Sequence, residues 1–260
     1  VALPSLHFQE SCFSIGTTMT TITLALSQLS NEALWLILLM TNFIAIIMSY
    51  RFFGKTGLYI WIPIATILAN IQVLKMVDLL SIGVTLGNIT YASSFLVTDI
   101  LSENHGKKAA KKAVFIGFFS LAATVVIMNI ALNFKPNEFD FIQESLNNIF
   151  AILPRIALAS LIAYGASQLH DVWAYNFWKN IFPQDKFLWL RNNASTMVSQ
   201  LLDSVLFTFI AFWGLLPQSE FIQILITTYL LKWIVAAIDT PFLYLAKFMY
   251  KQDMIGSDDV

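Results

Sequence analysis

The chain has 260 residues, of which 57% are hydrophobic and only 12% are charged, and its mean hydropathy is +0.69. Soluble domains carry about 25% charged residues, so this composition excludes an ordinary water-soluble protein. The net charge of -1 excludes a protein that binds nucleic acid through a general excess of positive charge. Cys12 is the only cysteine, which excludes an internal disulfide and a cysteine-based metal cluster.

Apolar stretches recur along the sequence with the length that membrane-spanning helices need. We expect an all-α fold, a polytopic transmembrane helical bundle of six to seven spans. Residues 1–32 form a Thr-rich lead-in whose structure the sequence does not indicate, 33–250 form one membrane domain, and 251–260 form a polar C-terminal tail. The expected spans are 33–50, 57–77, 82–102, 113–133, 149–170, 193–215 and 221–249.

The positive charges follow alternate spans. Cytoplasmic loops hold most of the Lys and Arg of a membrane protein, so this alternation predicts an N-terminus outside and a C-terminus in the cytoplasm, in a bacterial inner membrane. Of the 15 cations, those on the expected cytoplasmic side are Arg51, Lys55, Lys107, Lys108, Lys111, Lys112, Lys179, Lys186, Arg191, Lys247 and Lys251.

Polar side chains line one face of the span at 193–215. Asn192, Thr196, Ser199 and Asp203 follow one another at spacings of four, three and four residues, and Gln200 lies beside them, so they share one side of a helix. Hydrogen bonding between packed membrane helices explains hydroxyls and amides. A carboxylate at this depth costs far more than a hydroxyl, which favours a binding site.

Lys232 is the expected partner of Asp203. The two residues lie at similar distances from the short turn between the last two spans, roughly 18 to 20 Å from it at 1.5 Å per residue, so both should lie near the middle of the membrane. Two interpretations stay open, a purely structural ion pair and part of a solute site. Asp239 follows Lys232 by two helical turns and extends the same face.

Two further spans contribute candidate site residues. Asn88, Tyr91 and Asp99 lie on one face of the span at 82–102, although Asp99 is close enough to the cytoplasmic end to be a solvated carboxylate. Arg155 lies about 9 Å into the span at 149–170, where it is either a site residue or an anchor whose long side chain reaches water.

The sequence carries no signature of an enzyme. It has no phosphate-binding P-loop, dinucleotide fingerprint, HExxH or GxSxG motif, and no evident nucleophile stands beside a base. We therefore expect a non-enzyme without a cofactor or a metal, which contacts lipid and a small molecule. The sequence leaves open a homo-oligomer and a partner module that couples energy.

Two segments resemble the queuosine precursor transporter family, also called the vitamin uptake transporter family. They are YASSFLVTDILSENHGKKAAKKAVFIGF at 91–118 and the region 159–214, which contains SQLHD at 167–171 and RNNASTMVSQLLDSVLF at 191–207. The resemblance covers roughly residues 57 to 250. It implies import of 7-deazaguanines, the cyano or aminomethyl precursors or queuine, for the queuosine of transfer RNA.

Such a substrate fits the candidate residues. A guanine-like edge presents neighbouring N–H donors to a carboxylate and a carbonyl to an amide or a cation. We expect Asp203 to accept from the ring edge, Gln200 or Asn193 to bind the carbonyl and ring nitrogen, and Tyr91, Phe207 or Trp173 to cover the ring face. The alternatives are a substrate-binding subunit of an energy-coupling factor transporter and a structural membrane protein, in which the polar stripes serve packing.

Overall fold

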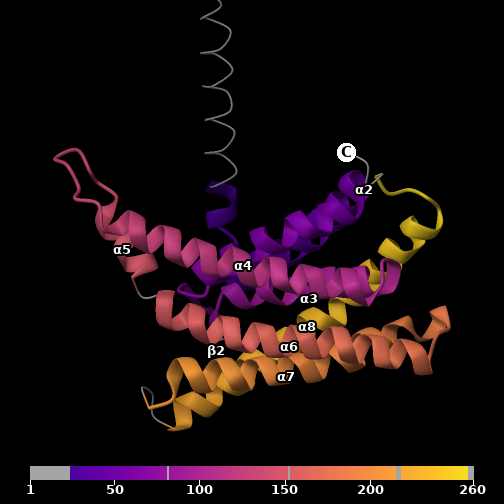
Figure 1. Cartoon of the computed structure of the whole chain (residues 1–260). Helices are drawn as coiled ribbons and strands as arrows, with labels where there is room; N and C mark the ends of the chain where they lie inside the picture. The colour runs from indigo at the N-terminus through magenta and orange to yellow at the C-terminus, as the bar shows by residue number, and fades with distance from the viewer. Residues whose placement is uncertain (1–23, 81, 152, 215–217, 257–260) are drawn as a thin grey trace, which may run out of the picture.

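The structure is a computed structural model, and it describes residues 24–80, 82–151, 153–214 and 218–256. Most of the described chain is helical, which confirms the expected all-α membrane bundle (Figure 1). Residues 1–23 of the lead-in lie outside the described residues. The elements are α2 (Asn31–Gln72), β1 (Met76–Leu79), β2 (Ile82–Thr85), α3 (Gly87–Asn104), α4 (Lys107–Leu132), α5 (Gln143–Phe150), α6 (Leu153–Ile181), η1 (Asp185–Phe187), α7 (Leu188–Phe212) and α8 (Gln218–Lys251).

Helix α2 is a helical hairpin with two arms. Gly54 has φ +56° and ψ -142°, a conformation that interrupts the helix and that glycine adopts without steric cost. The chain reverses there, because Ser49 Oγ donates to the carbonyl of Gly57 at 2.9 Å. Asn31, at the start of the first arm, donates to the carbonyl of Asp78, which follows the second arm. Each arm therefore crosses the bundle once.

The described chain crosses the bundle seven times. Among these residues, α2, α4, α6, α7 and α8 are long and apolar enough to span a membrane, α2 does so twice, and the 18 residues of α3 extend about 27 Å, close to the thickness of the hydrocarbon core. The first and last parts of the described bundle lie at opposite ends, which agrees with an odd number of crossings. Asn31 at the start of α2 lies beside β1, whereas Gly256 donates to the carbonyl of Arg51 beside the Gly54 turn.

Helix α3 is the central helix of the bundle. It packs against α2, α8, α4 and α6, and every residue from 92 to 102 is buried. Its shielding from lipid explains why it is less apolar than the five helices around it. On one side α6 lies between α4 and α7 (Figure 1), so α3, α6, α7 and α8 meet inside the bundle, where lipid does not reach.

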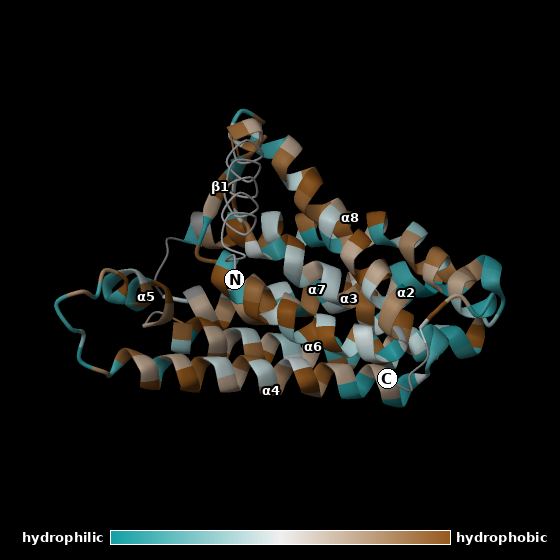
Figure 2. Cartoon of the chain, turned by 90° about the horizontal axis from the view of Figure 1, so that it is seen from above, coloured by the Kyte–Doolittle hydropathy of each residue, from teal (hydrophilic) through white to brown (hydrophobic). Residues whose placement is uncertain are grey.

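The lipid-facing surface is carried by apolar side chains. On α4, Phe115, Phe119 and Ile127 are 62%, 72% and 63% exposed, and Figure 2 shows hydrophobic residues along most of this helix. The hydrophilic residues of α4 gather at one end of the helix, where the lysines of its first turns lie (Figure 2). The start of α4, the Gly54 turn and the end of α8, here called the basic turns, lie at this end of the bundle.

Several expected boundaries are wrong. The second span ends at Gln72 and the third begins at Gly87, because β1 and β2 form an antiparallel hairpin in which Met76 pairs with Thr85. This segment mixes Lys75 and Asp78 with β-branched residues, a composition that suits an exposed hairpin better than a span. The fifth span does not stop at 170, since α6 continues for three more turns to Ile181.

We expect Gly57→Ala to destabilise the α2 hairpin. A Cβ atom at Gly57 would lie 2.1 Å from the carbonyl oxygen of Ser49, so the two arms would have to separate. Overpacking of this kind costs about 1 to 3 kcal/mol, or roughly 3 to 10 °C in Tm for a chain of this size. Thermal unfolding in detergent measures it. Gly165→Ala is the matched control, because the nearest atom to its Cβ would be 4.0 Å away. Equal Tm values for the two variants would contradict the close approach of the arms.

Candidate functional site

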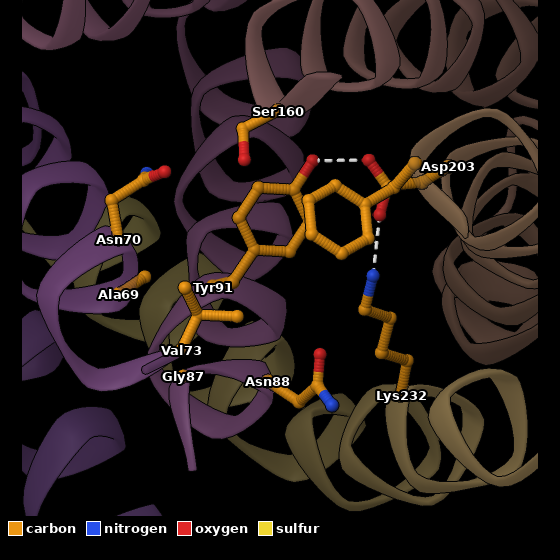
Figure 3. A pocket seen from close by; sticks show the side chains of 10 residues that line it. Ala69, Asn70, Val73, Gly87, Asn88, Tyr91, Ser160, Asp203 and Lys232 are labelled. Carbon is orange, nitrogen blue, oxygen red and sulfur yellow. Dashed lines mark hydrogen bonds and ion pairs between the residues drawn. The ribbon is translucent and has the colours of Figure 1, made fainter. Parts of the chain in front are cut away.

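A cavity lies between the helices toward the end of the bundle that carries the β hairpin. It is small, about 40 Å³, which is room for a few water molecules. The second arm of α2 and helices α3, α6, α7 and α8 all contribute to its walls (Figure 3). The lining residues are Ala69, Asn70, Val73, Gly87, Asn88, Tyr91, Ser160, Asp203, Phe207 and Lys232.

Asp203 is the centre of this cavity. One carboxylate oxygen forms an ion pair with Lys232, and the other accepts a hydrogen bond from the Tyr91 hydroxyl at 2.5 Å (Figure 3). The same oxygen also accepts a hydrogen bond from the Ser167 hydroxyl at 3.2 Å. Asp203 and Lys232 are only 2% and 3% exposed. The ion pair expected from the sequence is therefore present, and it joins α7 to α8 in the interior.

The surrounding helices hold Tyr91 against this pair. Gly87 begins α3, and a Cβ atom there would lie 2.4 Å from the carbonyl of Ala69, so glycine allows α3 to approach α2 closely one turn before Tyr91. The Lys232 ammonium lies 4.8 Å from the centroid of the Tyr91 ring, and the Tyr164 ring packs against that ring at 5.8 Å. One tyrosine thus contacts both charges of the pair.

The cavity combines the groups that a small, flat, polar molecule requires. A carboxylate accepts neighbouring N–H groups, an ammonium donates to a carbonyl, and Tyr91 and Phe207 offer ring faces. Asn70 adds an acceptor, because its Nδ2 donates to the carbonyl of Thr66 while its buried Oδ1 has no partner among the described residues. A few polar groups in an otherwise apolar cavity are typical of a ligand site.

Several predicted site residues lie in a second buried cluster instead. Thr196 donates to Asp99 Oδ2 at 3.3 Å, and Asn192 donates to Asp239 Oδ1 at 2.7 Å. Ser199 shares a hydrogen bond of 2.9 Å with His170. These residues are four to eleven positions from the nearest cavity residue on their own helices, so the polar face of α7 contributes both to the cavity and to this second cluster.

Three other candidates do not line the cavity. Asn193 donates to Thr240 at 2.9 Å and to the carbonyl of Trp189 at 2.8 Å, because it faces α8 ten residues before Asp203. Arg155 is exposed near the start of α6, which favours its role as an anchor. Gln200 is fully buried and neither side-chain polar atom has a partner among the described residues, but it lies outside the cavity.

Sequence reasoning missed four residues of the interior. Asn70 and Ser160 line the cavity, Ser167 binds Asp203, and Asp171 is fully buried beside Asp99. Asp171 was overlooked because the expected span ended at 170 and placed it in a loop. Its signal was present, since Ser167 and Asp171 are four residues apart and share a helical face.

A third polar cluster lies at the end of the bundle that carries the basic turns. Glu103 forms salt bridges with Lys179 at 3.3 Å, with Arg191 at 2.9 Å and with Lys247, and Tyr175 donates to it at 3.1 Å. Arg191 is fully buried, and its other terminal nitrogen donates to the carbonyl of Phe182. This cluster ties α3, α6, α7 and α8 together and is structural.

Comparison with known proteins places this arrangement in a family. Residues 85–246 match the family model described as "Putative vitamin uptake transporter". The chain belongs to the vitamin uptake transporter family. The match includes Tyr91, Asp203 and Lys232, and begins just before α3. The chain is thus a multi-pass membrane protein of a transporter family.

Three curated proteins are similar to the chain. A "Probable queuosine precursor transporter" of Bacillus subtilis is 44% identical over 223 residues, which are 86% of this chain and 97% of that protein. A protein of the same name from Haemophilus influenzae is 31% identical over 50% of this chain and 52% of its own length. The "Queuosine precursor transporter" of Escherichia coli is 30% identical over 56% of this chain and 62% of its own length. No solved structure is significantly similar to the chain.

We expect Glu103→Gln to destabilise this transporter strongly, although Glu103 does not line the cavity. The variant leaves buried Arg191 without its ionic partner, which typically costs about 3 to 5 kcal/mol. The measurement is thermal unfolding in detergent. Asp185→Asn is the control, because Asp185 is half exposed and pairs with Lys247 and Lys251 near the surface, where a pair is worth about 1 kcal/mol or less. A Glu103→Gln protein as stable as the control would contradict the structural role.

Proposed function

We propose that the chain imports 7-deazaguanine precursors of queuosine, and that the cavity around Asp203 is the substrate site. The observation that carries this proposal is the contact of Asp203, Lys232 and Tyr91 on the wall of a cavity lined by five helical segments. Family membership supplies the class of protein, and the names of the relatives supply the class of substrate.

The recognition follows from the hydrogen-bonding pattern of the base. A 7-deazaguanine presents the N1–H and the exocyclic amine on one edge, and a carboxylate accepts two such donors at once. In this proposal Asp203 accepts hydrogen bonds from both donors of this edge, while Lys232 donates to the neighbouring carbonyl of the base. Asn70 of α2 and Asn88 of α3, which also line the cavity, reach the remaining polar atoms (Figure 3). These asparagines replace Gln200 and Asn193 of the sequence-based hypothesis.

Substrate binding requires Tyr91 to move. A cavity of about 40 Å³ is smaller than a bicyclic ring, and the Tyr91 hydroxyl already occupies one carboxylate oxygen of Asp203. Replacement of that hydroxyl by the N–H groups of the base keeps the carboxylate satisfied and frees the Tyr91 ring to cover the face of the ligand. The exchange of one donor for another keeps the cost of opening low.

The orientation follows from the basic turns. We place the chain in the bacterial cytoplasmic membrane with its C-terminus in the cytoplasm, because the Gly54 turn, the start of α4 and the end of α8 carry most of the Lys and Arg at one end of the bundle. The substrate cavity lies toward the opposite half, on the side of the β hairpin. The substrate therefore enters from outside and leaves past the acidic groups of α3, α6 and α8.

We expect Asp203→Asn to weaken binding of 7-cyano-7-deazaguanine at least about 100-fold, because two charge-assisted hydrogen bonds are lost at roughly 1.5 kcal/mol or more each. Calorimetry on the detergent-purified protein measures the Kd, with guanine as a competitor. Asp78→Asn is the control, since Asp78 lies in β1 near the same end but outside the cavity.

The double variant Asp203→Asn with Lys232→Met separates recognition from folding. It removes both charges together, so no unpaired charge stays buried, and we expect it to fold with a Tm near that of the unaltered chain and still fail to bind. Normal affinity in either the single or the double variant would contradict the placement of the substrate at Asp203.

We expect the purified chain alone to support substrate uptake when it is reconstituted into liposomes. A stand-alone carrier needs no other subunit, whereas a substrate-binding subunit of an energy-coupling factor transporter binds its solute and moves it only with its partner module. Uptake of radiolabelled 7-aminomethyl-7-deazaguanine distinguishes these cases. Binding without uptake would indicate a substrate-binding subunit of an energy-coupling factor transporter. The absence of both binding and uptake would indicate that the polar residues of the cavity serve helix packing.

A further inference from the structure

Three carboxylates from three helices meet in the interior, outside the substrate cavity. They are Asp99 of α3, Asp171 of α6 and Asp239 of α8, here called the acidic triad. All three are fully buried, and they interact electrostatically with one another. Such a concentration of carboxylates inside a membrane domain is unfavourable if all three are ionised. Something must compensate the charge.

The cations near the triad form ion pairs with other carboxylates. Lys232 pairs with Asp203 on one side of the triad, and Arg191, Lys179 and Lys247 pair with Glu103 on the other. In the described part of the chain no ion pair joins a triad carboxylate to a cation. Two further titratable groups near the triad, His170 and Tyr175, bond to Ser199 and Glu103. The triad is therefore left with neutral hydroxyl and amide neighbours from α7.

The triad is short of hydrogen-bond donors. Asp99 Oδ1, both oxygens of Asp171 and Asp239 Oδ2 are buried and have no donor in hydrogen-bonding geometry among the described residues, although the hydroxyls of Ser195, Thr196 and Ser199 lie close enough to Asp171 to interact with it. Asn192 gives a second, independent sign of the same shortage. Its Nδ2 donates to Asp239 Oδ1 at 2.7 Å, while its own buried Oδ1 has no donor. Every one of these five unpaired atoms is an acceptor.

Protons bound to the triad neutralise its negative charge and also supply the missing hydrogen-bond donors. A proton on Asp239 Oδ2 supplies the donor that Asn192 Oδ1 lacks, and a proton between Asp99 and Asp171 lets one carboxyl donate to the other. A single sodium ion would leave two of three negative charges uncompensated. Among the described residues, moreover, no three His, Cys, Asp or Glu side chains are placed to hold a metal ion together. Protonation is the simpler solution.

We propose that the acidic triad holds at least two exchangeable protons and is the site where import is coupled to proton entry. Each carboxylate takes H⁺ from the outer water as the bundle opens outward, becomes a neutral carboxyl when buried, and releases H⁺ to the cytoplasm. The coupling part rests on the proposed function.

The triad is well placed for coupling to the substrate cavity. Asp99 follows Tyr91 by eight residues, Asp239 follows Lys232 by seven and Asp171 follows Ser167 by four, so the triad lies about 6 to 12 Å along the same helices toward the basic end. Tyr91, Lys232 and Ser167 are the three groups that hold Asp203. A shift of these helices that opens the cavity therefore also moves all three triad carboxylates.

Infrared spectroscopy on the detergent-purified protein tests the protons directly. We expect a carbonyl stretching band of protonated carboxyls that shifts in D₂O and that loses intensity in Asp99→Asn, Asp171→Asn and Asp239→Asn. Because an amide has nearly the shape of a neutral carboxyl, Asp171→Asn should fold with an unchanged Tm. Asp185→Asn and His170→Asn are controls that leave the band intact. A band that is absent, or that is equally strong in all variants, overturns the proposal.

Uptake into liposomes tests the coupling. We expect a gradient that is acidic outside to accelerate uptake of 7-cyano-7-deazaguanine several-fold, a sodium gradient to have no effect, and Asp171→Asn to bind substrate but lose the response to pH. A response to sodium, or a normal response to pH in Asp171→Asn, overturns the coupling. If the unaltered chain takes up nothing, the proposed function fails, and the infrared band alone still decides whether the triad holds protons.

Discussion

The cost of burying charge in a membrane domain shapes this structure. Asp203 and Lys232 can lie in the interior only because each neutralises the other, and the removal of one partner from a buried pair typically costs about 3 to 5 kcal/mol. The pair fixes the relative depth of α7 and α8. It also orients Tyr91, which donates to the carboxylate and lies against the ammonium. The surrounding helices bury this pair almost completely.

The polar interior forms one continuous line along α7. From Arg191 to Thr208 its inward residues are almost completely buried, and 17 steps of 1.5 Å extend about 26 Å, most of the thickness of a bilayer. Three different solutions to buried charge follow one another along this line. Glu103 is matched by several cations, the acidic triad has hydroxyl and amide neighbours, and Asp203 is matched by one lysine and two hydroxyls.

Such a line suits a carrier better than a purely structural bundle. A structural core gains nothing from carboxylates without donors, because buried polar groups in stable interiors are normally satisfied. The unpaired acceptors at Asp171 and Asn192 are the kind of exception that accompanies function. The paired site nearer the hairpin and the donor-poor triad nearer the basic end then share the tasks of holding substrate and holding protons.

Much of this organisation could be predicted from the sequence, and the failures have physical causes. Hydropathy located the helices, because a span needs about 20 apolar residues whatever surrounds it. Equal depth around a short turn predicted the contact of Lys232 with Asp203, since helical rise is nearly constant. Helical periodicity gathered the polar residues of α7 on one face, but it could not distinguish the cavity from the triad, because that division depends on the neighbouring helices.

The boundaries were less predictable. The hairpin at β1 and β2 replaced two expected helix ends, because a short exposed strand pair has no strong periodic signal. The true length of α6 was hidden because polar residues such as His170 and Asp171 resemble a loop when nothing shows that other helices enclose them. Asn193 has the right chemistry for a purine, but the packing of α7 on α8 directs its amide to Thr240. Tertiary contacts, which a single sequence does not reveal, decided each of these cases.

The central claim is that the substrate takes the place of the Tyr91 hydroxyl on Asp203. A cryo-EM structure of the protein with 7-aminomethyl-7-deazaguanine tests it most directly. The account predicts density for the ring between Asp203 and Phe207, with the carboxylate on the amine-bearing edge and the Tyr91 hydroxyl displaced. Ligand density elsewhere, with the contact between Tyr91 and Asp203 unchanged, would contradict it and assign the pair to packing alone.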